Sequence, residues 1–156
     1  MPATNIIFPN AQVSTGANLR APAEQTIAMD NGVPQSASPV SKIGYATGAG
    51  LAVVQITNRS TGVTINATCG TITTDTTSLA AEVVAKFTVT NSAVEVGDVV
   101  VASIRSGSNG GNTDVYVSTV AAGSFQLAVA NGNAAAGAAE TGAIIINFAV
   151  VKAVSA

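Results

Sequence analysis

The chain lacks histidine and tryptophan entirely, and only 9 % of its 156 residues are charged. Without histidine it cannot build a Ser-His-Asp triad, a Cys-His dyad or an imidazole metal site. The 6 Lys and Arg residues are scattered along the sequence and form no basic patch, whereas nucleic-acid binding requires several neighbouring cations. We therefore expect a protein that is not an enzyme, uses no cofactor or metal, and does not bind nucleic acid.

Cys69 is the single cysteine, so no intrachain disulfide can form and an oxidising compartment is not needed. Its neighbours offer no base to activate a thiol, and we expect a small buried residue rather than a nucleophile. No apolar run approaches the roughly 20 residues that cross a bilayer, and the first ten residues lack the features of a secretory signal. We expect a soluble protein, folded in a cytoplasm, with no membrane partner.

Charge and aromatic residues are both scarce, the latter at 4 % of the chain, so the exposed surface must consist mainly of Thr, Ser, Asn, Gln, Gly and Ala. Such side chains are easily desolvated, which suits packing against a partner. The hydrophobic residues, 47 % of the chain, are mostly Ala and Val. A core of small side chains buries modest area per residue, so we expect a homo-oligomer in which further surface is buried.

Residues 1–42 contain all five prolines and show no sustained hydrophobic period. Proline removes an amide donor and fixes its own φ, so this stretch is predicted to be an extended N-terminal arm without a long helix or central strand. Its apolar residues are too few for a core and too many for a purely solvated tail. Two interpretations stay open: a disordered or self-packed lead, and an arm that docks on another subunit.

From about residue 43 onward the sequence is rich in β-branched residues, alternates between apolar and polar positions, and is interrupted by turn-forming residues. Strands with one apolar face must bury these faces against each other. We therefore predict an all-β domain over residues 43–156, an antiparallel β-sandwich or jelly roll. The pattern predicts about eight strands, at residues 53–57, 62–66, 69–74, 83–90, 98–104, 114–120, 125–129 and 144–151.

Three connections carry more specific predictions. The strands at 114–120 and 125–129 are joined by the short Gly-containing sequence AAGS, which is typical of a hairpin. Residues 106–112 have no side chain large enough to pack and are predicted to form a surface loop. Residues 134–140 are predicted as a loop or a single turn, because Gly137 and the short length disfavour a helix.

The chain contains only weak matches to motifs of catalytic, calcium-binding and phosphate-binding sites. Glu95 and Asp98 could form the carboxylate pair of a glycosidase, but their spacing around Val96-Gly97 is more typical of a solvated turn. Asp75 lies among threonines and offers too few oxygens for a convincing calcium site. The glycine-rich sequence at 44–50 lacks the Lys-Ser/Thr ending and the following helix of a P-loop.

Six segments of the chain are distinctive when they are considered together in their order: residues 44–50, 54–66, 87–92, 98–101, 120–125 and 146–152. They resemble a β-rich module of tailed-bacteriophage structural proteins, in which such segments are expected in the same order. The resemblance covers residues 43–153 and does not extend to the arm. The module is similar to those of head decoration (cement) proteins and of some fibre-associated proteins.

The resemblance implies a structural virion protein, made in the host cytoplasm and located on the capsid surface. It would decorate or cement a bacteriophage head by binding the major capsid protein. It implies an oligomer, with a trimer expected at capsid symmetry positions. The arm would be the anchor, because an extended segment can contact partners on both sides. The residues expected to contact the capsid or another subunit are Ile6, Ile7, Phe8 and Leu19, with Arg20 as a charged contact.

A second function stays open, namely a receptor-binding or glycan-binding module of a phage fibre or tail. Exposed aromatic rings that stack on sugars would be expected of such a module. The chain has only Tyr45, Tyr116 and four phenylalanines. This shortage favours head decoration.

Overall fold

The computed structural model describes residues 27–30, 33–36, 45, 49–109 and 111–153, and the chain forms two compact units, Met1–Gly44 and Tyr45–Ala156. In the first unit, β2 (Ile27–Asp30) pairs antiparallel with β3 (Val33–Ser36). Sequence analysis missed this hairpin, although the Asn-Gly pair between the strands is a frequent two-residue turn sequence.

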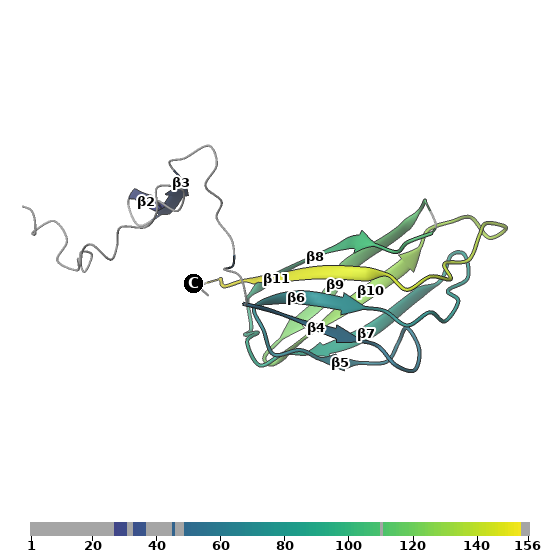
Figure 1. The fold of residues 1–156 in the computed structure, drawn as a ribbon, viewed down its shortest axis with the longest axis horizontal. Helices are drawn as coiled ribbons and strands as arrows, with labels where there is room; N and C mark the ends of the chain where they lie inside the picture. Colours follow the sequence, from purple (N-terminus) through teal and green to yellow (C-terminus); the bar gives the residue numbers. More distant parts are fainter. Residues whose placement is uncertain (1–26, 31–32, 37–44, 46–48, 110, 154–156) are drawn as a thin grey trace, which may run out of the picture. The chain divides into compact units, whose positions relative to one another are not determined.

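The second unit is a sandwich of two four-stranded sheets (Figure 1). One sheet has the strand order β5-β7-β10-β9 and the other has the order β4-β6-β11-β8. The described residues contain no helix, so the predicted all-β sandwich of eight strands is confirmed in this unit. Its strands are β4 (Gly50–Val54), β5 (Val63–Thr64), β6 (Cys69–Thr73), β7 (Val84–Thr90), β8 (Val99–Ser106), β9 (Thr113–Ala121), β10 (Ser124–Asn131) and β11 (Ile145–Val151).

The core lies between the two sheets and follows from the alternation in the sequence. In β7, Ala85, Phe87 and Val89 are buried while Lys86 and Thr88 are exposed, because successive side chains of a strand point to opposite faces. The rings of Phe125 on β10 and Phe148 on β11 meet across the sandwich at a centroid distance of 5.3 Å. The two sheets are thus joined by direct side-chain packing.

The prediction that all strands are antiparallel was wrong. β4 runs parallel to β6, and β5 runs parallel to β7. After β4 the chain crosses to the other sheet as β5 before it returns as β6, so β4 and β6 are not joined by a hairpin and run in the same direction. The first strand is also displaced from its predicted position at residues 53–57, because β4 ends at Val54. Beyond this end, the side chain of Gln55 donates hydrogen bonds to the carbonyl oxygens of Arg59 and Thr61.

The predicted hairpin is confirmed, because β9 and β10 pair antiparallel on either side of Ala122-Gly123. One residue is bulged from β9 next to the Gln126 and Leu127 positions of β10. Residues 134–140 form turns and loop without a helix, as predicted. The second unit therefore follows the sequence pattern closely except at its first two strands.

Candidate functional site

The predicted contact residues Ile6, Ile7, Phe8, Leu19 and Arg20 lie outside the described residues, and their role stays a prediction. In the sandwich, two clusters of polar side chains lie beyond opposite ends of β11. The first gathers around Lys152, just after the end of this strand, and the second around Arg59 and Glu140, before its start. The two clusters and the outer faces of the sheets are the candidate sites.

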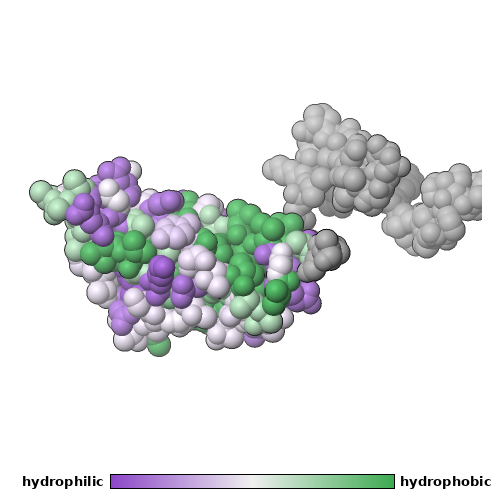
Figure 2. Space-filling view, turned by 180° about the vertical axis from the view of Figure 1, so that it is seen from behind, coloured by the Kyte–Doolittle hydropathy of each residue, from purple (hydrophilic) through white to green (hydrophobic). Residues whose placement is uncertain are grey.

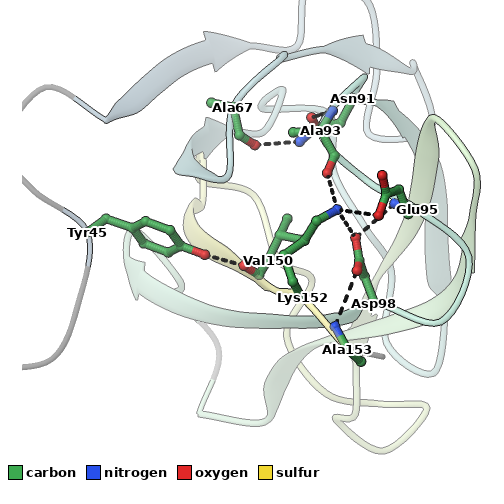
Figure 3. Close-up of polar contacts among 9 residues, drawn as sticks. All are labelled: Tyr45, Ala67, Asn91, Ala93, Glu95, Asp98, Val150, Lys152 and Ala153. Carbon is green, nitrogen blue, oxygen red and sulfur yellow. Dashed lines mark hydrogen bonds and ion pairs between the residues drawn. The ribbon is translucent and has the colours of Figure 1, made fainter. Parts of the chain in front are cut away.

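The cluster around Lys152 contains both carboxylates of the predicted turn (Figure 3). Lys152 Nζ lies 2.8 Å from Asp98 Oδ2 and 3.1 Å from Glu95 Oε2. The turn is confirmed by a hydrogen bond from the Asp98 amide to the Glu95 carbonyl. It is not simply solvated, however, because the Asp98 side chain is 1 % exposed whereas that of Glu95 is 77 % exposed. Both carboxylates pair with one ammonium group and do not face each other across a cleft, as a glycosidase requires.

Further hydrogen bonds in this cluster hold several segments of the chain together at one end of the sandwich. The Tyr45 hydroxyl donates to the Val150 carbonyl, and Lys152 Nζ donates to the Ala93 carbonyl at 2.9 Å. The buried Asn91 Nδ2 donates to the Ala67 carbonyl at 2.7 Å. Figure 3 shows these groups converging from the start, middle and end of the second unit. The arrangement holds chain segments together.

The charges of Asp98 and Lys152 are coupled to folding. The Lys152 ammonium, followed by the Glu95 amide, donates hydrogen bonds that lower the pKa of Asp98 below its ordinary value. Asp98 in turn raises the pKa of Lys152, and Glu95 adds to this effect. The Asp98 contribution to stability is therefore complete above the ordinary aspartate pKa and is lost as the pH falls through the lowered value. The Lys152 contribution is complete below the ordinary lysine pKa and is lost as the pH rises through the raised value.

We expect Asp98→Asn to be less stable than the wild type at neutral pH, with the difference narrowing in acid as Asp98 of the wild type becomes protonated. Urea unfolding at a series of pH values measures this difference. Glu95→Gln is the matched control, and it should have a small effect at all pH values because Glu95 is largely exposed. Equal pH profiles for Asp98→Asn and wild type would contradict the assignment.

The second cluster centres on Arg59, which is 3 % exposed. Its guanidinium donates to the carbonyl oxygens of Thr77 at 2.5 Å, Gly142 at 2.6 Å and Glu140 at 3.3 Å, and to Thr74 Oγ1 at 3.1 Å. Burial lowers the pKa of Arg59, and the nearby charges of Glu140 and Asp75 oppose this shift. Arg59 thus joins the connection after β4 to two other connections at the same end of the sandwich.

Glu140 is fully buried beside Arg59 and was missed by the sequence analysis. Its carboxylate accepts hydrogen bonds from Ser108 Oγ at 2.9 Å, the Asn109 amide at 3.1 Å and Thr113 Oγ1 at 2.6 Å. These contacts tie the predicted surface loop after β8 to the segment before β11. The available signal was that Glu140 is the only charged residue between Asp114 and Lys152. Both clusters are consistent with a structural role.

Asp75, considered above for a weak ion site, is engaged within its own turn. Its carboxylate accepts hydrogen bonds from the hydroxyl of Thr77 and, at 2.7 Å, from the amide of the same residue. The Thr77 hydroxyl is the main cause of a lowered pKa of Asp75. In the part of the chain that the structure describes, no three Cys, Asp or Glu side chains come together as metal ligands.

The two outer faces of the sandwich differ in chemistry. The outward positions of β7, β10 and β9 are rich in Thr, Ser and Gln and include Lys86 and Asp114. Figure 2 views the molecule from this side and shows a largely pale and purple surface with separate green areas. The outward positions of the other sheet are mostly aliphatic or small, and Arg105 is the only charged residue among them: Gly50, Ala52, Val54, Cys69, Thr71, Thr73, Val99, Val101, Ser103, Arg105, Ile145, Asn147, Ala149 and Val151.

This aliphatic face carries a cluster of exposed valines and a hollow. The cluster, called the valine ridge below, consists of Val99, Val101 and Val151, whose exposed fractions are 53–55 %. The hollow is a shallow depression of about 530 Å³. Its lining residues are Gly50, Leu51, Ala52, Cys69, Gly70, Thr71, Asn147 and Phe148.

The depression explains why Cys69 is only partly buried, contrary to the prediction. Cys69 points outward from β6, and its neighbour in the pairing with β4 is Gly50, which has no side chain to cover the thiol. A Cβ added at Gly50 would lie 3.5 Å from Cys69 Sγ, an ordinary contact distance. The sheet therefore has space at this position that a side chain from outside could fill.

Comparison with known proteins adds no identification. No protein-family model, curated protein or solved structure matches the chain. Among the described residues, no helix is long and apolar enough to span a membrane.

Proposed function

We propose that the protein is a structural component of a bacteriophage virion that decorates or cements the head by binding the major capsid protein. In this proposal a jelly-roll-like sandwich is fastened to the capsid surface by an extended N-terminal arm, with Ile6, Ile7 and Phe8 as apolar anchors, and catalyses no reaction. The sequence resemblance described above is the source of the phage assignment.

The observation that carries the proposal is the pairing or burial of several charged side chains among the described residues. Asp98 pairs with Lys152, and Arg59 and Glu140 are buried in hydrogen bonds that join connections. What remains on the outer faces is largely uncharged. Such surfaces lose little hydration when covered, which favours lasting contact with neighbouring proteins.

Binding to heads tests the proposal directly. We expect the purified full chain to cosediment with phage heads that lack it, and a chain starting at residue 43 to lose most of this binding. Binding by the shortened chain as strong as that of the full chain would contradict the role of the arm. If the full chain does not bind heads but binds bacterial surface glycan, the receptor-binding alternative is supported instead.

Single substitutions sharpen the test of the anchors. Burying one large apolar side chain contributes about 1.5–3 kcal/mol, so Ile7→Asp should weaken head binding by roughly tenfold or more. Thr4→Asp introduces the same charge three residues away and is the matched control. Equal affinities of the two variants would exclude Ile7 as an anchor.

A further inference from the structure

The valine ridge and the depression lie on the same face and at the same level along the strands. Pairing between strands places Gly50 beside Cys69, Cys69 beside Ala149 and Ala149 beside Val101. These four residues form one row across the sheet, from the edge strand β4 to the edge strand β8. On β8 the row ends in the branched side chain of Val101, and on β4 it ends in Gly50, which has no side chain.

We infer that this face binds a second copy of the chain across a two-fold axis that runs parallel to the strands. An axis between β6 and β11 places β8 of each copy over β4 of the other, and β11 over β6. Because Val101 and Gly50 share a row, the valine ridge of one copy enters the depression of the other, and symmetry repeats the contact. This arrangement does not depend on the phage assignment.

The charge distribution permits this pairing. Arg105 is the only charged residue among the outward positions of the face. In the proposed arrangement the two β8 strands lie over opposite edges of the interface, three strand spacings or roughly 14 Å apart. At that separation the repulsion between the two Arg105 side chains is largely screened at physiological ionic strength.

The area of the face predicts a weak dimer. Four strands about 4.8 Å apart and five to eight residues long cover roughly 19 by 21 Å, so the pair covers about 800 Å² before the corrugation of the side chains is counted. Stable specific interfaces usually exceed about 1,000 Å², so a weak association, in the micromolar range or weaker, is expected. The trimer expected from the resemblance would need patches that face two different neighbours around a ring, whereas the ridge and the depression share one face.

The mass of the full chain in solution tests the inference. Sedimentation equilibrium should show a mass that rises with concentration from 15.3 kDa to twice that value. Val101→Asp should weaken the association by more than about tenfold. Val84→Asp is the matched control, since Val84 is 44 % exposed on the outer side of β7 in the other sheet.

Three results would overturn the inference: a monomer up to the solubility limit, equal weakening by both variants, or a mass three times that of the chain. The last would support the trimer instead. Each of these results is independent of head binding, so the inference and the proposed function can fail separately.

A disulfide test examines the pairing of β8 with β4. In a Cys69→Ser background, Gly50→Cys and Val101→Cys are introduced together. Within one chain these positions are three strand spacings apart, which is too far for a disulfide. Oxidation should therefore give covalent dimers from the double variant and none from either single variant. Absence of covalent dimers at concentrations where the mass is doubled would exclude this pairing.

Discussion

Replacing Phe125 by alanine is expected to lower the free energy of unfolding by about 3–5 kcal/mol. Phe125 is 2 % exposed, and its ring meets that of Phe148 from the opposite sheet at 5.3 Å. Alanine would remove the ring contact and leave a cavity between the sheets that neighbouring side chains fill only in part. A domain of this size has a total stability of about 5–15 kcal/mol, so the loss is a large fraction.

Urea unfolding followed by circular dichroism measures this effect. Tyr116→Ala is the control, because Tyr116 is an aromatic residue on the neighbouring strand β9 but is 42 % exposed on the outer face. Its loss should cost less than about 1 kcal/mol. Similar values for the two variants would mean that the contact between the sheets contributes little to stability.

Replacing Arg59 by methionine is expected to destabilise the protein by about 3–5 kcal/mol. Methionine keeps much of the side-chain volume but donates no hydrogen bond. Thr77 and Gly142 would lose the donor to their carbonyl oxygens, and the favourable interaction of the buried Glu140 with the charge of Arg59 would be lost. Each buried group left without a partner carries a desolvation cost.

Two further variants identify the cause of the Arg59 effect. Arg59→Lys keeps the charge but cannot reproduce the planar set of donors, so it should recover only part of the lost stability. Arg105→Met removes an arginine from the exposed end of β8 and should change the free energy of unfolding by less than about 0.5 kcal/mol. Full recovery by Arg59→Lys would show that charge alone matters at this position.

Much of the sandwich could be predicted from the sequence because its strands alternate. Phe87 and Val89 mark the inner face of β7, and Val115 marks that of β9. The AAGS hairpin was likewise predictable from its short, glycine-containing connection. In these segments the local pattern and the tertiary packing require the same structure.

The parallel pairs and the buried charges could not be predicted in the same way. β5 has only two residues, and its place beside β7 depends on where the chain crosses between sheets, which no local pattern encodes. Arg59 and Glu140 look like surface residues in sequence, since charged side chains usually are. Their burial depends on carbonyl and hydroxyl groups from segments up to 83 residues away. The polar network was therefore visible only once the chain was folded.

The pairing of β4 with β6 along its whole length affects how the second unit responds to mechanical load. Tension applied to the chain ahead of Tyr45 enters the sandwich through β4, its first strand. When the rest of the sandwich is held, a pull along the strand axis loads the backbone hydrogen bonds between β4 and β6 in shear, so they share the load and do not unzip one at a time. A protein tethered by its N-terminal segment would thus yield at a higher force than one whose first strand could be peeled away.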